Sequence, residues 1–320
     1  MLHRFLLPVL MLGLCVTAFC QQEPQFSHYM YNRAFFNAAY SGSGDALEIN
    51  ALHRTQYVGI APTAINTQFF GVSLPVYAIN SGVGLIVIND LAGALRSTYA
   101  SVQYCYRHKF RWGALAAGLS AGLIQSGLDG AKLRTPEGKY VSGIDHNDEL
   151  LPLTLQQALS PDFAAAIYIN GKKWHIGLSA NHLVASTAKF SSGLKVNYSR
   201  NLFLTAGYDI KVAKRFSLFP SVFAKTDFLK AQADFSIQSN FLNNFLAGVS
   251  FRGYNNPTID MLAFFAGFMF KGFRLVYSYD WNISALNNFN SGSHEVSIAY
   301  VLKMAPREIK PLIYHNVRFL

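Results

Sequence analysis

The sequence is poor in cysteine. Of its three cysteines, Cys15 and Cys20 lie in an apolar stretch at the N-terminus, so Cys105 stands alone in the rest of the 320 residues. A single thiol forms no intramolecular disulfide and does not supply the set of ligands that a zinc site needs. We therefore expect Cys105 to be a small apolar filler within the fold.

Charge is also scarce, and long apolar runs are missing. Charged residues make up 14% of the chain, whereas 51% is hydrophobic and 14% aromatic. Soluble domains carry about 25% charged residues. After the N-terminal stretch, no apolar run reaches the ~18 residues that a transmembrane helix needs. A closed barrel crosses a membrane without such a run, because its strands alternate between lipid-facing and lumen-facing residues. The composition therefore favours a transmembrane outer-membrane β-barrel.

Residues 1–20 have the parts of a secretory signal. Residues 1–4 are positively charged, residues 5–16 are almost wholly apolar, and a small-x-small pattern ends at Cys20. A membrane anchor would need about 20 apolar residues. A lipoprotein acylated at Cys20 is a further alternative, disfavoured by the bulky residue before it. We expect cleavage before Gln21 and an exported protein.

Strict alternation of residue character appears in several segments. In residues 273–282 the odd positions are all apolar or aromatic, and in residues 293–303 the pattern recurs with opposite parity. Strands of a soluble sandwich also alternate, but that fold does not explain the aromatic residues at strand ends, where a membrane barrel has its girdles. We predict about 14 antiparallel strands, an even number as is usual in such barrels, over residues 46–57, 63–74, 82–89, 98–109, 112–124, 162–170, 174–184, 199–212, 216–225, 230–239, 245–251, 258–270, 273–282 and 293–303.

The predicted connections alternate in length. Long connections, the longest at residues 125–161, alternate with tight turns such as residues 170–172 and 271–272. Outer-membrane barrels have short periplasmic turns and longer outer loops. This parity predicts a periplasmic N-terminal segment at residues 21–44, a barrel at 45–303 and a periplasmic tail at 304–320, with the longest loop outside the cell.

Many of the basic residues behind the net charge of +10 fall in the tight turns. Without a basic helix or a basic and aromatic groove, we expect them to form a solvated rim beside anionic headgroups, not a nucleic-acid site. The acidic stretch at residues 145–149 lacks the glycine and distal glutamate of a calcium loop. His294 and Glu295 are adjacent, so on a strand they point to opposite faces. We predict no enzyme activity, no metal and no cofactor.

The segment QQEPQFSHYMYNRAFFNAAYSGSG, residues 21–44, is aromatic yet follows no strand or helix period. Disordered segments are poor in aromatic residues. We therefore expect its aromatic side chains, Phe26, Tyr29, Phe35, Phe36 and Tyr40, to pack against the inner surface of the barrel or a partner. Its backbone amides and carbonyls have no strand partner. We expect them to form hydrogen bonds with polar side chains, namely those of Gln25, Ser27, Asn37 and Arg54.

Short motifs along the chain resemble those of one family, the PorP/SprF outer-membrane proteins associated with type IX secretion and gliding motility of Bacteroidota. They lie at residues 25–30 (QFSHYM), 37–42 (NAAYSG), 53–57 (HRTQY), 135–138 (TPEG) and 291–296 (SGSHEV), with Asp145 and Asp162-Phe163 after the fourth. The family usually has Asn-Pro-Ala-Tyr where this chain has Asn37-Ala38-Ala39-Tyr40, and tryptophan in place of Tyr57. Both changes keep the loop-forming and aromatic character.

The resemblance implies a barrel without cofactor or catalytic residue, whose partners are type IX secretion or motility proteins in the periplasm and outer membrane, with a secreted surface adhesin as a further partner. Our main hypothesis is a binding platform for them. The alternatives are a passive porin or transporter for a small solute, and a soluble exported β-sandwich adhesin. Partner-binding or structural roles are implied for the motif residues Gln25, Phe26, Ser27, Tyr29, Asn37, Tyr40, Arg54, Gln56, His294 and Glu295.

Overall fold

The structure is a computed structural model that describes residues 23–60, 65–184, 186–254 and 259–304. The predicted signal peptide, residues 1–20, and all but the first residue of the predicted tail, residues 304–320, lie outside the described residues. Within the described residues, no helix is long and apolar enough to span a membrane.

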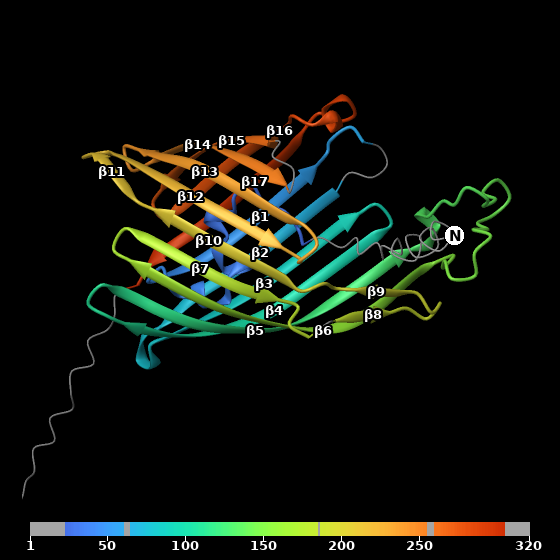
Figure 1. The fold of residues 1–320 in the computed structure, drawn as a ribbon, viewed down its shortest axis with the longest axis horizontal. Coiled ribbons are helices and arrows are strands. Elements are labelled where there is room, and N and C mark those ends of the chain that lie inside the picture. The colour runs from blue at the N-terminus through green and yellow to red at the C-terminus, as the bar shows by residue number, and fades with distance from the viewer. Residues whose placement is uncertain (1–22, 61–64, 185, 255–258, 305–320) are drawn as a thin grey trace, which may run out of the picture.

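The wall is a closed antiparallel sheet (Figure 1). Each strand pairs with the next along the chain, and the first strand pairs with the last, which closes the ring. The wall strands are β1 (Ala46–Gln56), β2 (Ile65–Val76), β3 (Ser81–Ala92), β4 (Leu95–Lys109), β5 (Gly113–Asp129), β6 (Leu155–Gly171), β7 (Trp174–Asn181), β10 (Asn201–Tyr208), β11 (Ile210–Ala213), β12 (Phe216–Thr226), β13 (Ala231–Phe241), β14 (Phe245–Tyr254), β15 (Ile259–Phe270), β16 (Phe273–Asn282) and β17 (Ser293–Lys303).

The wall has 14 strands, because β10 and β11 are two halves of one strand on either side of Asp209 and both pair with β12. Every predicted strand has a counterpart, and the largest difference is at β6, which begins at Leu155 and not at the predicted residue 162. The predicted alternation is confirmed in β16, where Val276, Ser278 and Asp280 are buried in the lumen while Tyr277 and Trp281 are each 45% exposed on the outer face. The outer-membrane barrel fold is therefore confirmed.

Long connections lie at one end of the barrel, which we call the loop end. They include residues 130–154 and the connection from β7 to β10, which contains a hairpin of β8 (Thr187–Lys189) and β9 (Lys195–Asn197). The predicted loop over residues 125–161 is shorter in the structure, because β5 and β6 stay paired out to Asp129 and Leu155. These two strands project beyond their neighbours (Figure 1).

The connections at the opposite end, which we call the turn end, are all short, and the start of β1 and the end of β17 lie there too. One connection at the loop end is also tight, because β3 ends at Ala92 and β4 begins at Leu95. Three aromatic rings stack on the outer surface of the turn end. Phe110 and Trp112 have ring centroids 5.2 Å apart, and Trp112 lies 6.2 Å from Trp174. Arg111 and Lys172 belong to the same two turns. Stacked aromatic rings beside basic turns are typical of the level of lipid headgroups.

Candidate functional site

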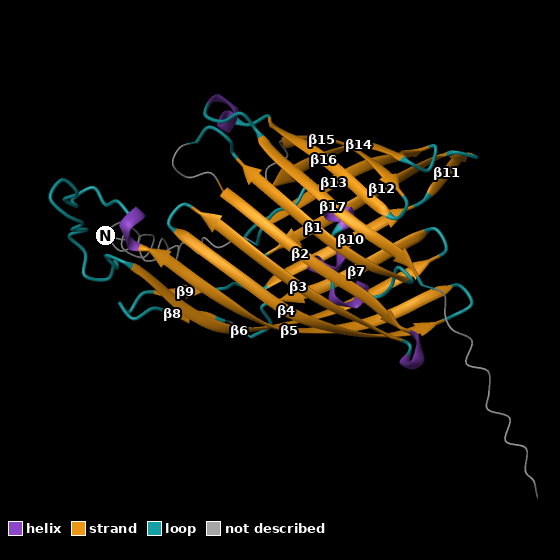
Figure 2. Cartoon of the chain, turned by 180° about the vertical axis from the view of Figure 1, so that it is seen from behind, coloured by secondary structure: helices purple, strands orange, loops and turns teal. Residues whose placement is uncertain are grey.

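Residues 23–45, which we call the plug, lie inside the barrel. The plug forms three short helices, η1 (Tyr29–Tyr31), α2 (Arg33–Phe36) and η2 (Ala38–Tyr40), which lie within the strands in Figure 2. The sequence predicted that the aromatic side chains of this segment pack against the inner surface of the barrel or a partner, and in the structure they pack inside the lumen. Its aromatic side chains form the largest apolar cluster with wall residues such as Phe69, Phe203 and Phe223.

The plug runs from one end of the lumen to the other. At the loop end, a carboxylate oxygen of Glu23 lies 2.8 Å from Nε2 of His182, which follows β7. At the turn end, Asp45 pairs with Arg107 of β4 at 2.8 Å and leads directly into β1. A single pass of about twenty residues therefore crosses the interior before the wall begins.

Wall side chains satisfy much of the plug's backbone. Gln103 donates to the carbonyl of Ala34 at 2.8 Å, Cys105 donates to the carbonyl of Ser41 at 2.9 Å, and the amide of Gly42 donates to Ser73 at 2.7 Å. The plug thus needs no internal period, because its hydrogen-bond partners come from a surrounding surface. Cys105 is buried, as expected, but it also holds the plug.

Within the plug itself, Asn37 does what the sequence predicted. Its side-chain oxygen accepts a hydrogen bond from the amide of Ala39 at 2.9 Å, and its side-chain nitrogen donates to the carbonyl of Ile167 at 3.0 Å. The wall approaches closely here because small residues face the plug. A Cβ added to Gly118 would lie 2.5 Å from the backbone nitrogen of Ala39, so only glycine fits at this position.

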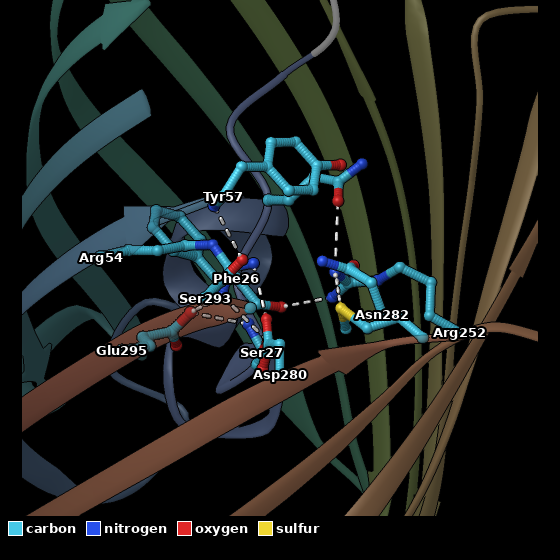
Figure 3. A network of polar contacts seen from close by, with 12 residues as sticks. Phe26, Ser27, Arg54, Tyr57, Arg252, Asp280, Asn282, Ser293 and Glu295 are labelled. Carbon is cyan, nitrogen blue, oxygen red and sulfur yellow. Dashed lines mark hydrogen bonds and ion pairs between the residues drawn. The ribbon is translucent and has the colours of Figure 1, made fainter. Parts of the chain in front are cut away.

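A buried charged cluster holds the first turn of the plug. We call it the lock, and it consists of Ser27 and His28 of the plug with Arg54 of β1, Asp280 of β16 and Glu295 of β17. Figure 3 shows Ser27 with Arg54, Asp280 and Glu295. The two oxygens of Glu295 each accept a backbone amide, from Ser27 and from His28, both at 2.8 Å. The hydroxyl of Ser27 donates to Asp280 at 2.8 Å.

Arg54 joins the two carboxylates of the lock. Its guanidinium lies 2.6 Å from Asp280 and 2.9 Å from Glu295, and it also donates to the hydroxyl of Ser27 at 3.1 Å. One cation thus faces two carboxylates in a fully buried site. The plug's two amides and hydroxyl supply the remaining donors. Without the plug, the lock would lack hydrogen bonds that buried carboxylates require.

The lock unites motifs that lie far apart in the sequence. Four of its five residues come from the segments at 25–30, 53–57 and 291–296, and Asp280 alone lies outside them. The model of the family described as "Type IX secretion system membrane protein PorP/SprF" matches residues 18–300. The chain belongs to the PorP/SprF family. Family membership and the closed barrel together place it in the outer membrane.

Among curated proteins, none matches the chain in sequence. Solved structures with a similar fold include the CymD monoaromatic hydrocarbon channel, at 11% identity over 80% of this chain and 87% of that one, with a TM-score of 0.48. The toluene transporter TbuX of Ralstonia pickettii has 9% identity over 85% and 93%, with a TM-score of 0.49. Omp33 of Acinetobacter baumannii has 8% identity over 81% and 99%, with a TM-score of 0.43.

A second buried cluster holds the plug beside the lock of this PorP/SprF barrel. Arg252 pairs with Asp234 at 2.8 Å and donates to the side chain of Gln25 at 3.2 Å and to the carbonyl of Phe26 at 3.3 Å. Gln25 also donates to Gln232 at 2.9 Å. These contacts place Gln25 and Phe26 against β13 and β14.

A third cluster holds the loop end of the plug. His182 lies between Glu23, at 2.8 Å, and Asp162, at 2.7 Å. Burial lowers the pKa of His182, but the charge of Glu23 and the two carboxylate hydrogen bonds outweigh it and raise that pKa to about 10. Burial raises the pKa of Glu23, but the charge and hydrogen bond of His182 outweigh it, so that the pKa is lowered. Both groups are therefore charged at neutral pH.

The remaining residues singled out in the family motifs have different positions. Tyr29 lies in the lumen, 2.9 Å from the hydroxyl of Ser221, and Tyr40 donates to Glu48 at 3.2 Å. Gln56 lines a cavity at the loop end. His294 is on the outer face, where it contacts the hydroxyl of Tyr277 at 2.7 Å. Among the motif residues, His294 therefore does not join the lock, in agreement with the opposite faces predicted for it and Glu295.

Sequence analysis missed some residues that hold the plug. Asp280 lies outside every motif, and alternation in β16 turns its side chain into the lumen, where it accepts the hydrogen bond of Ser27 at 2.8 Å. Asp234, Arg252 and His182 lie in segments without a motif. For Asp234 and Arg252, the available signal in the sequence was a charged residue at an inward-facing strand position.

Two cavities flank the plug. The loop-end cavity is about 380 Å³ and the turn-end cavity about 230 Å³, and they share no lining residue. Within the part of the chain that the structure describes, no three histidine, cysteine or acidic side chains gather into a group that could hold a metal ion.

Proposed function

We propose that the protein is a non-enzymatic outer-membrane component of the type IX secretion machinery, whose barrel is a binding platform for secretion partners and not an open pore. The observation that carries the proposal is the plug. It crosses the lumen and is held by three buried charged clusters, centred on Arg54, Arg252 and His182.

We further propose that the loop end lies outside the cell and the turn end in the periplasm, as the loop lengths suggest. In this orientation Glu23 faces the outer mouth, and the start of β1 faces the periplasm. The basic turns then point to the periplasm, where an acidic protein surface is the complementary partner.

The outer surface at the loop end offers apolar side chains to a second partner. Val141, Leu150 and Leu153 project from the loop over residues 130–154, and each is more than half exposed. Exposed apolar patches are typical of protein-binding surfaces, and these three side chains belong to one loop. We infer that a secreted protein binds here, on a lobe supported by the projecting β5 and β6.

The alternative of a passive transporter draws support from the two cavities. A shift of the plug would join them into a path through the barrel. The two functions make opposite predictions for the ion conductance of the resting protein: a binding platform should be closed, and a transporter should conduct. A conductance measurement therefore distinguishes the platform from the transporter.

The test combines conductance with recovery of partners. The purified protein in a planar bilayer should conduct almost no ions, and a pull-down from detergent-solubilised membranes should recover defined partners. Charge reversal in the turns, Lys172→Glu with Lys214→Glu, should remove periplasmic partners only. Val141→Asp with Leu150→Asp should remove outer partners only. A resting protein that conducts ions and recovers no partner would favour the transporter.

A further inference from the structure

The loop-end cavity is large enough for a small molecule. Its volume of about 380 Å³ lies within the range of ligand pockets, ~300–1,000 Å³. The plug provides one side of it through Glu23, Gln25 and Phe35, and strands of the wall provide the rest. The cavity is therefore complete only when the plug is in place.

The deep part of the cavity is apolar and aromatic. Phe35, Ile88 and Ile124 are buried residues that line it, and the rings of Tyr57 and Tyr99 join them. Such a lining favours a ligand with an apolar body. Aromatic faces also attract organic cations, because their π-electrons are negative at the face of the ring.

The polar lining is mainly acidic. The carboxylates of Glu23, Asp90 and Asp227 line the cavity, with His182 and Lys230 as the cations. Glu23 is paired with His182, and Asp227 accepts the backbone amides of its own turn at 3.0 and 2.7 Å.

Asp90 is in a different position. It accepts a hydrogen bond from the hydroxyl of Thr67 at 2.5 Å, and no cationic side chain among the described residues pairs with it. A half-buried carboxylate without a cation favours a positively charged ligand.

We propose that this cavity binds a small organic cation, a protonated amine on an apolar body of about the size of one aromatic ring. The ammonium group binds Asp90, and the apolar body lies against Phe35 and Ile88. Because residues of the plug form part of the site, the ligand binds only the plugged barrel. It therefore stabilises the plug in the lumen.

Phenethylamine, protonated at neutral pH, is a suitable probe. Titration calorimetry on the full-length mature protein in detergent should detect binding of phenethylamine, with much weaker binding of phenethyl alcohol and none of 3-phenylpropionate. Asp90→Asn keeps the acceptor for Thr67 but removes the charge, and it should weaken binding about tenfold or more. Glu48→Gln, in the turn-end cavity, is the matched control and should bind as the unchanged protein does.

A second variant tests the cavity itself. Ala92→Trp places a large ring in the cavity and leaves Asp90 unchanged, so it should abolish binding. The heat-dependent gel migration of each variant checks its assembly. Binding should also raise the melting temperature of the unchanged protein. Failure of phenethylamine to bind, equal affinity for the amine and the alcohol, or unchanged binding by Ala92→Trp would each overturn the proposal.

Discussion

The backbone amide of Ser27 donates a 2.8 Å hydrogen bond to the carboxylate of Glu295, although 268 positions separate the two residues. Glu295 lies at the start of the last strand, which closes the wall against the first. The first turn of the plug is therefore built onto the strand that completes the barrel. Placement of the plug and closure of the wall use the same residue.

Removal of the cation from the lock should release the plug. Arg54→Met leaves Asp280 and Glu295 buried without a counterion, and breaking a buried pair in this way costs about 3–5 kcal/mol. Water entering an unplugged lumen would solvate both carboxylates, so we expect the plug to detach while the wall stays closed. Ion conductance in a planar bilayer should rise above that of the unchanged protein.

Lys132→Met is the control for this variant. Lys132 forms a partly exposed pair with Asp129 at 3.6 Å, and such pairs contribute at most about 1 kcal/mol. It should leave the conductance unchanged. Adding Asp280→Asn to Arg54→Met should restore part of the closed state, since it removes one unpaired charge. An Arg54→Met barrel that stays closed would show that the lock is dispensable.

The fit of the plug against the wall gives a second prediction. Gly118→Ala places a methyl group 2.5 Å from the backbone of Ala39, and overpacking of this kind costs about 1–3 kcal/mol. The plug should shift and expose Cys105, which is buried and hydrogen-bonded to the plug. Maleimide labelling of this thiol should become faster.

Gly127→Ala is the matched control, because the nearest atom to its added methyl group would be 3.7 Å away. Labelling should remain slow in this variant. Equal labelling rates in Gly118→Ala and the unchanged protein would mean that the plug tolerates the methyl group in place.

The sequence predicted the wall well because its signal is local. Alternation in a strand such as β16 depends on neighbouring residues, and the direction of each side chain follows from it. The position of the plug was harder to predict from the sequence. Its aromatic residues indicated burial, but its hydrogen bonds go to residues such as Gln103 and Glu295, which are distant in sequence. No local period encodes those contacts, so the sequence left open whether the segment packs against the inner surface of the barrel or against a partner.

The lock shows the same limit in its individual residues. Ser27, Arg54 and Glu295 were identified through motifs. Arg252 and His182, which hold the plug outside the lock, lie in no motif, and their partners in the plug, Gln25 and Glu23, are distant in sequence. His294 was included only because it shares a motif with Glu295. Alternation separates the two residues onto opposite faces of the wall.

The contact between His182 and Glu23 predicts a pH dependence. The pKa of His182 is raised from 6.5 to about 10, so its contribution is complete below pH 6.5 and is lost as the pH rises to about 10. The pKa of Glu23 is lowered from 4.5, so its contribution is complete above pH 4.5 and is lost at lower pH. Stabilisation by this pair should therefore be greatest between pH 4.5 and 6.5.

His182→Asn isolates this effect. The difference in melting temperature between the unchanged protein and the variant should be largest near pH 5.5, which is the middle of the window from 4.5 to 6.5. It should shrink toward pH 10 and toward pH 3. A difference independent of pH would mean that His182 acts through packing and not through charge.

The two ends of the barrel should differ in accessibility. Asn147 lies in the loop over residues 130–154, and Lys172 lies in the tight turn between β6 and β7 at the opposite end. With the proposed orientation, an epitope tag inserted at Asn147 should bind antibody on intact cells, and one at Lys172 should bind only after the outer membrane is permeabilised. The reverse pattern would invert the orientation.

Deletion of residues 24–41 tests the plug as a whole. The wall strands pair with one another around the full ring, and none of their ladder bonds involves the plug. The lumen residues Arg54, Asp280 and Glu295 can be solvated by water once the plug is gone. We therefore expect a barrel that assembles, shows heat-dependent gel migration and conducts ions, but no longer supports secretion.

The comparison of this deletion with Arg54→Met separates two roles of the plug. If partners bind the plug itself, the deletion should lose them, whereas a barrel whose plug is merely released should keep part of the binding. If partners bind only the loop and turn surfaces, both variants should retain them in a pull-down, and secretion should fail through leakage alone. A deletion that does not assemble would instead make the plug a part of the folding core, since it supplies most of the aromatic cluster in the lumen.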